Sequence, residues 1–307
     1  MMTNEIKAEG ERRKAETFSL VPCAFCLREA TAQLAHTDSP RLTAEVLLAH
    51  TLNVSRAQLL AHPERELSEA EQLQFTIAVQ RAAEGEPLAY ILGHKEFHGL
   101  DFLVNQHVLV PRPETELLVD LAVEFLSTRV REGISSELKV LDVGTGSGCI
   151  AVTLAVKRPQ ANVTALDISE EALAVAQENA ARHGVAQRVT FAKSDLLTAL
   201  RQLPTHFHLI TANLPYIATD EARALPVSRH EPLLALDGGP DGLLWVRRLL
   251  VDAPRHLHAG GLLLLEIGHT QGQAAQTLAQ AAFPAARVQI HQDLAGLDRI
   301  ISVRLRS

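Results

Sequence analysis

The first third of the chain alternates apolar and polar residues at the spacing of helices. The segment RLTAEVLLAHTLNV, which starts at residue 41, follows the helix start signal DSP and brings its apolar residues to one side of a helix. A second segment, LSEAEQLQFTIAVQRAAEG, begins with Ser68 and Glu71 in the spacing of a capping box and ends at Gly85. The pattern is helical throughout residues 25–83. It predicts a small helical bundle, which is too small to be a catalytic domain by itself and is more typical of a module that recognises a partner.

The pattern changes after residue 87. Short runs of β character, broken by glycine and asparagine, predict a hairpin linker over residues 88–110, and ETELLVDLAVEFLSTRV predicts a helix after it. The first residues are polar and irregular, and we expect them to form a mobile extension. The predicted organisation is a mobile extension over residues 1–22, a helical substrate-recognition domain over 23–87, the hairpin linker over 88–110, and a larger domain over 111–307.

From Leu138 onward, strand-like and helical segments alternate. The candidate strands are KVLDV, NVTALDI, RVTFAKS, FHLITAN, GGLLLLEIG, ARVQIHQ and RIISVRL, with helices such as SEEALAVAQENAARHG and DGLLWVRRLLVDAPRHL between most of them. This alternation predicts an α/β fold with a doubly wound, mostly parallel, seven-stranded sheet. Only DLAGLD joins the last two strands, and this is too short for a crossover helix. The final strand is therefore expected to run antiparallel to its neighbours.

The composition argues against several classes of protein. A formal net charge of −7 disfavours a protein that coats a nucleic-acid duplex, which normally needs a basic face. Cys23, Cys26 and Cys149 cannot make a disulfide framework, and the C-x-x-C pair has no second pair or His cluster to complete a zinc site. No apolar stretch approaches the roughly 20 residues of a membrane span, and the polar first residues lack a signal-peptide core. We expect a cytoplasmic monomer without a metal, a membrane or a stable nucleic-acid partner.

The segment VLDVGTGSGCIAVTLA predicts a strand, a glycine-rich turn and a helix. Asp167 ends the next predicted strand, where a carboxylate can bind two ribose hydroxyls of either NAD or S-adenosylmethionine. The third glycine comes one residue too early for the dinucleotide pattern G-x-G-x-x-G. Asp142, before the turn, would repel a diphosphate but suits a sulfonium cation. The pattern therefore favours S-adenosylmethionine. The candidate residues of the turn are Gly144, Thr145, Gly146, Ser147 and Gly148.

The segment AKSDLL follows the third predicted strand and adds two candidates for the cofactor site. Asp195 can accept a hydrogen bond from an adenine amino group, but it can equally be the N-cap of a helix, and the sequence leaves both interpretations open. Leu196 can cover the adenine ring.

The segment NLPYI follows the fourth predicted strand, in line with the glycine turn after the first. Methyl transfer from a sulfonium is an in-line displacement, so the nucleophile must be held close to the methyl group and aligned with it. An amide or aryl amine is a poor nucleophile because its lone pair is delocalised, but two acceptors that hold both of its hydrogens turn the lone pair toward the methyl group. The Asn213 side-chain oxygen and the carbonyl of Leu214 are candidates for these acceptors. Pro215 stiffens the turn, and Tyr216 can pack on a planar amide or base.

With these motifs in this order, the chain closely resembles the protein-glutamine methyltransferases that act on peptide chain release factors. The resemblance runs from about residue 27 to the C-terminus. It rests on RLTAEVLLAH, YILGHKEFHGLDFLVNQHVLVPRPETELLVD, LDVGTGSGCIAVTLA, ALDIS, NLPYI and HEPLLALDGGPDGL. It implies methylation of the side-chain amide of the glutamine in the Gly-Gly-Gln motif of release factors, with S-adenosylmethionine as the methyl donor. The implied fold joins a small helical domain through a hairpin to a seven-stranded methyltransferase domain.

By position, the resemblance implies that residues 144–148 and Asp167 bind the cofactor and that Leu196 lies near adenine. It also implies that Asn213 contacts both cofactor and substrate, and that residues 214–216 shape the glutamine pocket. One residue departs from the family pattern Asn-Pro-Pro-Tyr, because Leu214 stands where the first proline belongs. The carbonyl of residue 214 is retained, so we expect activity to be retained.

Three other functions are compatible with these residues. The first is methylation of a ribosomal-protein glutamine. By family resemblance, the segment RPETE favours release factors over such a substrate. A nucleic-acid amino methyltransferase, of the adenine N6 type, faces the same lone-pair problem, but it would be expected to flip its base and to carry a basic or aromatic-rich recognition region. The acidic chain, with 4% aromatic residues, does not favour it. A non-catalytic binding module is the third, and Leu214 is the feature that would suit it.

Overall fold

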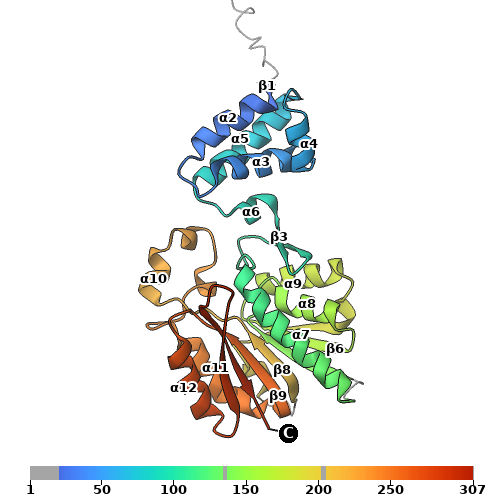
Figure 1. Ribbon diagram of the computed structural model, residues 1–307, viewed down its shortest axis with the longest axis vertical. Helices are drawn as coiled ribbons and strands as arrows, with labels where there is room; N and C mark the ends of the chain where they lie inside the picture. Colours follow the sequence, from blue (N-terminus) through green and yellow to red (C-terminus); the bar gives the residue numbers. More distant parts are fainter. Residues whose placement is uncertain (1–20, 134–136, 202–204, 307) are drawn as a thin grey trace, which may run out of the picture. The chain divides into compact units, whose positions relative to one another are not determined.

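The computed structural model of the chain describes residues 21–133, 137–201 and 205–306. The chain divides into two compact units, residues 1–92 and 93–307 (Figure 1). Most of the extension expected at residues 1–22 lies outside the described residues. Its last two residues are described, and they form the short strand β1 (Val21–Pro22) rather than an irregular segment.

The first unit is a helical bundle around a small apolar core. Leu34, Leu47 and Leu48 are fully buried in this core. The predicted capping box is confirmed: the Ser68 hydroxyl accepts from the Glu71 N–H, and the Glu71 carboxylate accepts from the Ser68 N–H at 2.8 Å. The helices are α2 (Cys23–Gln33), α3 (Pro40–Thr51), α4 (Arg56–Ala61), α5 (Glu69–Ala83) and α6 (Leu88–Leu92).

The prediction of an all-helical segment over residues 25–83 is wrong at one place. The short strand β2 (Glu66–Leu67) separates α4 from α5 and pairs antiparallel with β1. Leu67 is fully buried although its backbone is extended. Its apolar side chain therefore fits the helical pattern of the sequence, which hides the strand. The C-x-x-C pair lies in the first turn of α2, and both thiols are free.

The second unit begins with the predicted hairpin, which is shorter than the linker assigned to residues 88–110. It consists of β3 (His94–Phe97) and β4 (Leu100–Leu103), while residues 88–92 are helical. Phe97 and Phe102 are buried and pack edge to face, with their ring centroids 6.1 Å apart. Both rings belong to a core cluster that includes residues of the sheet, so the hairpin is anchored in the second unit.

A seven-stranded sheet forms the centre of the second unit, and all seven predicted strands are confirmed. The spatial order is β10-β11-β9-β8-β5-β6-β7. The last strand, β11, is antiparallel to both of its neighbours, β10 and β9, as the short connection before it predicts. The remaining four neighbouring pairs, from β9 across to β7, are parallel. The strands are β5 (Leu138–Val143), β6 (Ala161–Asp167), β7 (Val189–Lys193), β8 (Phe207–Ala212), β9 (Leu257–Glu266), β10 (Arg287–Gln292) and β11 (Asp298–Arg304).

Helices cover both faces of this sheet (Figure 1). Residues of β5 alternate between two core clusters, Leu138 and Val140 in one and Leu141 and Val143 in the other, because successive side chains of a strand point to opposite faces. The first cluster contains α7 and α8, and the second contains α11 and α12. The longer helices are α7 (Glu116–Arg131), α8 (Cys149–Lys157), α9 (Glu170–Arg182), α11 (Leu244–Asp252) and α12 (Gly272–Ala282). Within the described ranges, no helix has both the length and the apolar composition to cross a bilayer.

Candidate active site

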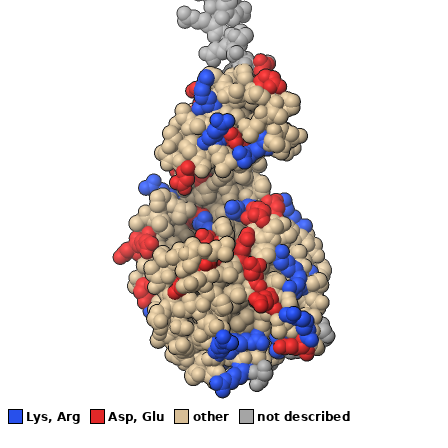
Figure 2. Space-filling model, viewed as in Figure 1, with Lys and Arg blue, Asp and Glu red and all other residues tan. Residues whose placement is uncertain are grey.

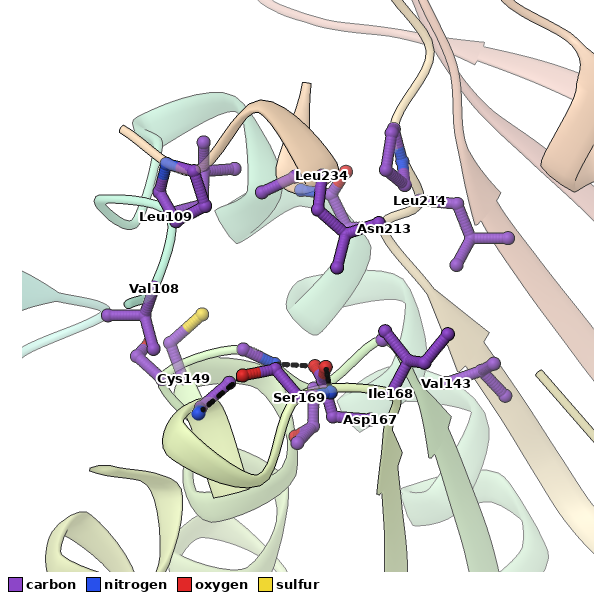
Figure 3. Close-up of a pocket in the computed structure, with 18 of the residues that line it drawn as sticks. Val108, Leu109, Val143, Cys149, Asp167, Ile168, Ser169, Asn213, Leu214 and Leu234 are labelled. Atoms are coloured by element: carbon purple, nitrogen blue, oxygen red, sulfur yellow. Dashed lines mark hydrogen bonds between the residues drawn. The ribbon is translucent and has the colours of Figure 1, made fainter. Parts of the chain in front are cut away.

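The chain changes direction across the sheet between β5 and β8. From β5 it continues through β6 and β7 to one edge, and it then returns to place β8 on the other side of β5. In open α/β sheets, ligands bind beyond the carboxyl ends of the strands at such a point. A cavity of about 250 Å³ lies there (Figure 3). Its lining comes from residues 106–115, the glycine turn 143–150, the segments after β6, β7 and β8, and residues 232–245.

Asp167 is held rigidly at the wall of this cavity. Its Oδ2 accepts a hydrogen bond from the Gly146 N–H at 2.8 Å, and its Oδ1 accepts one from the Ser169 N–H at 3.0 Å. Burial raises the pKa of Asp167, and these two backbone donors oppose that rise. Each carboxylate oxygen can accept more than one hydrogen bond, so both can still receive a ligand hydroxyl. Figure 3 shows Asp167 on the side of the cavity opposite Asn213.

Asp142 does not line the cavity. It is almost fully buried below the turn, where it accepts hydrogen bonds from the hydroxyls of Thr145 at 2.7 Å and Thr211 at 2.8 Å. Burial raises its pKa to about 6, against the effect of both hydroxyls. Asp142 therefore ties the glycine turn to β8 and does not contact the cavity.

Asn179 is a residue that the sequence pattern did not reveal. It lies on α9 and is fully buried. Its amide donates to the carbonyls of Ser147 at 2.9 Å and Leu103 at 3.0 Å, and its Oδ1 accepts from the Leu103 N–H at 2.8 Å. One side chain therefore ties the hairpin to the glycine turn. In the sequence it looks like an ordinary polar position on an amphipathic helix, because its partners are 32 and 76 residues away.

Gly148 is the glycine of the turn that tolerates a side chain least. Its φ is +79°, and a Cβ would meet the Cβ of Ala176 at 3.0 Å and its Cα at 3.2 Å. We expect Gly148→Ala to lower the free energy of unfolding by about 2–4 kcal/mol, from backbone strain plus overpacking. Gly184→Ala is the matched control, because its φ of +68° imposes similar strain while no atom lies within 4 Å of its Cβ. Urea unfolding followed by circular dichroism measures both, and equal losses would show that close packing on α9 is unimportant.

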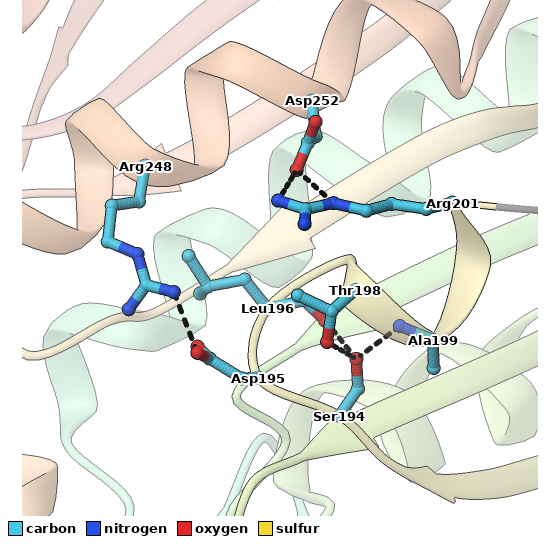
Figure 4. Close-up of polar contacts among 8 residues, drawn as sticks. All are labelled: Ser194, Asp195, Leu196, Thr198, Ala199, Arg201, Arg248 and Asp252. Carbon is cyan, nitrogen blue, oxygen red and sulfur yellow. Dashed lines mark hydrogen bonds and ion pairs between the residues drawn. The ribbon is translucent and has the colours of Figure 1, made fainter.

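Asp195 and Leu196 both line the cavity, as expected for residues after β7. The Asp195 side chain does not cap a helix, since the short helix after it begins at Thr198. Its carboxylate instead pairs with the Arg248 guanidinium at 2.7 Å (Figure 4). That guanidinium also lies over the ring of Trp245, 5.0 Å from its centre. Leu196 adopts a left-handed backbone with φ of +50°.

Asn213 lies at the carboxyl end of β8 and lines the cavity. Its Nδ2 donates a hydrogen bond to the Thr115 hydroxyl oxygen at 3.0 Å. Within the described residues, its Oδ1 has no hydrogen-bond donor. The side chain thus leaves an acceptor oxygen without a donor, and its predicted role as the acceptor for a substrate N–H stays a prediction.

The structure brings Leu214 and Pro215 into the cavity lining but not Tyr216. The Leu214 side chain is buried, and its Cδ2 would lie 3.1 Å from a Cβ on Gly144. The Tyr216 hydroxyl donates to Glu266 Oε1 at 3.5 Å, and its carbonyl accepts from Gln271 at 2.8 Å. These contacts hold Tyr216 outside the lining, and its packing against a substrate amide stays a prediction.

The segment HEPLLALDGGPDGL forms an apolar wall of the cavity through Pro232, Leu234 and Ala235. Glu231, just before this wall, has a fully buried side chain and pairs with the Arg112 guanidinium at 2.6 Å. Gly242, with φ of +74°, packs on the loop after β8, since a Cβ would lie 2.2 Å from the Tyr216 carbonyl oxygen. Glycines of this segment therefore allow it to pack closely on that loop.

Both units carry charged side chains of both signs on the face shown in Figure 2. These acidic and basic side chains are interspersed, and no continuous basic surface is visible there. Among residues 21–133, 137–201 and 205–306, no group of three or more His, Cys, Asp or Glu side chains is arranged to hold a metal ion.

Two family models match the chain. The one described as the PrmC N-terminal domain matches residues 26–93, and the one described as a methyltransferase domain matches residues 134–266. The release factor glutamine methyltransferase of Moorella thermoacetica is 46% identical over 89% of this chain and 95% of its own length. That of Nitratidesulfovibrio vulgaris is 43% identical over 91% of this chain and 93% of its own.

Two solved structures share the fold at low sequence identity. The N-terminal domain of human METTL16 in complex with SAH aligns with a TM-score of 0.51 at 14% identity, over 90% of this chain and 94% of that one. The hMettl16 catalytic domain in complex with the MAT2A 3′UTR hairpin 6 aligns with a TM-score of 0.53 at 12% identity, over 80% and 86%. At such identities, the likeness is one of fold alone.

Proposed function

Because the chain belongs to the release factor glutamine methyltransferase family, we propose that it methylates the side-chain amide nitrogen of the glutamine in the Gly-Gly-Gln motif of peptide chain release factors. It is an S-adenosylmethionine-dependent protein-glutamine methyltransferase. The proposal adds the identity of the protein substrate and the residues that carry out the reaction.

The residues present fit S-adenosylmethionine. When bound, it supplies an activated methyl group on a sulfonium. Asp167 offers acceptors for two ribose hydroxyls, and the glycine turn leaves room, since Gly146 lines the cavity and a Cβ there would meet no atom within 4 Å. Leu196 would cover the adenine. Asp195 would accept from the adenine amino group while it keeps its pairing with Arg248, because a carboxylate accepts at two oxygens.

The methylation chemistry rests on Asn213, and this residue carries the proposal. Its Oδ1 would accept one hydrogen of the substrate amide, and the Leu214 carbonyl would accept the other. With both hydrogens held, the amide nitrogen cannot rotate freely, and its lone pair is directed out of the plane of the acceptors. Pro215 and the apolar wall formed by Pro232, Leu234 and Ala235 would exclude water from the amide. Orientation of this kind is the main help that a methyl transfer between neutral and cationic partners needs.

The N-terminal unit is proposed to recognise the protein substrate. It carries its own apolar core, and residues 26–93 match a family model distinct from that of the methyltransferase domain. Its exposed apolar side chains include Leu73, 63% exposed, and Ile77, 49% exposed, one turn apart on α5. Such side chains suit contacts with another protein surface.

Purified release factor and S-adenosylmethionine with a labelled methyl group test the proposed function. We expect one methyl group per release factor, located by mass spectrometry on the glutamine of the Gly-Gly-Gln motif. A release factor with that glutamine replaced by alanine is the control and should stay unlabelled. Ribosomal proteins, RNA and DNA are assayed in parallel, and label in one of them but not in the release factor would contradict the proposal.

A further inference from the structure

The proposed mechanism leaves one large aromatic residue of the cavity lining without a role. Trp245 is the single tryptophan of the chain, and it lines the cavity from the first turn of α11. Its Nε1–H donates a hydrogen bond to the Asp237 carbonyl at 2.8 Å, and its partly buried ring packs against the core cluster that contains α11 and α12. Because the indole N–H already has its partner, the ring offers a ligand only its aromatic surface.

A single guanidinium contacts both Trp245 and Asp195. Arg248 follows Trp245 by three residues on α11, a spacing that places two side chains on the same side of a helix. Its guanidinium carbon lies 5.0 Å from the centre of the Trp245 ring, and its Nη2 donates to Asp195 Oδ2 at 2.7 Å. Figure 4 shows Arg248 extending from its helix toward Asp195. Trp245 and Asp195 both line the cavity and Arg248 does not, so Arg248 connects two lining residues from outside.

The pair of Arg248 with Asp195 contributes little to the stability of the fold. The two side chains are 39% and 40% exposed, and solvent screens an ion pair of that exposure. Its main effect is on the direction of the Asp195 carboxylate, because an unpaired side chain would exchange among several rotamers. Oδ2 is bound to Arg248, while Oδ1 has no hydrogen-bond donor within residues 21–133, 137–201 and 205–306. The pair thus fixes a carboxylate at the cavity with one oxygen unused.

We propose that Trp245 and Arg248 complete the adenine site of the cofactor. In this arrangement, the Trp245 ring is an aromatic wall for the purine, and Arg248 is a positioning residue that holds Asp195 with Oδ1 directed at the adenine amino group. Aromatic rings stack favourably on nucleobases because every base has a flat π-face. The inference rests on the proposed placement of adenine at Asp195 and Leu196, and it adds α11 to the elements that form this site.

Such a site selects adenine over hypoxanthine. A carboxylate oxygen accepts a hydrogen bond from the amino group of adenine, but it repels the carbonyl oxygen that hypoxanthine carries at the same position. We therefore expect the wild type to bind S-adenosylhomocysteine about 10-fold to 100-fold more tightly than S-inosylhomocysteine. The selection depends on a fixed carboxylate, because a mobile one can turn away from the hypoxanthine oxygen and accept from the neighbouring N1–H.

Because Trp245 is the only tryptophan, its fluorescence reports directly on the proposed wall. S-adenosylhomocysteine and adenosine should both change the emission at saturation, whereas methionine, which lacks the base, should not. By isothermal titration calorimetry, Trp245→Leu should raise the Kd for S-adenosylhomocysteine about 10-fold, a typical effect of losing the stacking of one base, and Trp245→Phe should raise it far less. Unchanged emission with S-adenosylhomocysteine bound, or a wild-type Kd in Trp245→Leu, would show that the ring does not contact the base.

Arg248→Met tests the positioning role, because it keeps an unbranched side chain against Trp245 but cannot pair with Asp195. The Kd values for S-adenosylhomocysteine and S-inosylhomocysteine should come to within a few-fold of one another in this variant, while the free energy of unfolding in urea stays close to that of the wild type. Arg248→Lys, which can pair through one N–H, should restore the selection.

Arg247→Met is the matched control. Arg247 is the neighbouring residue on the same helix and pairs with Asp241, and neither residue lines the cavity, so this variant should keep the selection of the wild type. Wild-type selection in Arg248→Met would overturn the inference. None of these measurements uses a release factor, so failure to methylate a release factor would count against the proposed function alone.

Discussion

Replacement of Asn213 by alanine is expected to lower kcat for methyl transfer to the release factor by about 10²–10³-fold, the typical loss when one preorganised hydrogen-bonding group is removed from an active site. The substrate amide would lose the acceptor for one of its two hydrogens, so it could rotate and its lone pair would no longer be directed at the methyl group. Asn213 is one of many residues that line the cavity, so the Kd for S-adenosylmethionine should increase only a few-fold. Single-turnover kinetics and isothermal titration calorimetry measure the two quantities separately.

The matched control for this substitution is Asn162→Ala. Asn162 lies near the start of β6, at the opposite end of the strand from the cavity, and its amide donates to exposed Glu137 at 3.2 Å. Its loss should leave both kcat and the Kd unchanged. Asn213→Asp is informative as well, because it keeps an acceptor oxygen but cannot donate to Thr115. Unchanged turnover in Asn213→Ala would show that the amide is oriented by other groups and would remove the basis of the proposed mechanism.

The sheet and the cofactor turn could be predicted from the sequence because their signals are local. Each strand is a short apolar run bounded by turn residues, and the antiparallel final strand follows from a connection of six residues, DLAGLD. The positions of Asp167 and Asn213 at the cavity follow from topology alone. Both residues end or directly follow parallel strands, and the carboxyl ends of such strands share one edge of the sheet.

The partners of these residues could not be predicted, since they come from distant parts of the chain. Thr115 is 98 residues from Asn213, and Arg248 is 53 residues from Asp195. Nothing in RPETE or GGLLLLEIG marks Thr115 or Glu266 as neighbours of NLPYI. The contacts of Tyr216 could not be predicted for the same reason, because its hydroxyl donates to Glu266, 50 residues further on.

Replacement of Asp167 by alanine is expected to weaken S-adenosylmethionine binding by about 100-fold. A carboxylate that accepts from two ribose hydroxyls makes two charge-assisted hydrogen bonds, and their joint loss of roughly 3 kcal/mol corresponds to that factor. Asp167→Asn should lie between alanine and the wild type, because an amide keeps one acceptor oxygen but loses the charge. At saturating S-adenosylmethionine, kcat should change far less than the Kd, because Asp167 lies across the cavity from Asn213 (Figure 3).

Weaker binding in Asp167→Ala could also come from a distorted turn, because Asp167 accepts hydrogen bonds from the Gly146 and Ser169 N–H groups. A control must separate this effect from the loss of contacts with the ribose. Asp293→Ala is the matched control: Asp293 accepts from the Ala295 and Leu297 N–H groups in the turn before β11 and does not line the cavity. If Asp167 acted only by holding its turn, both variants would lose stability, and a stabilising osmolyte would also restore the binding of S-adenosylmethionine by Asp167→Ala. If Asp167 contacts the ribose, the osmolyte should restore stability but leave the Kd weakened. A Kd for S-adenosylmethionine that returns to the wild-type value when the Asp167→Ala protein is stabilised would mean that the carboxylate shapes the turn and makes no direct contact with the ribose.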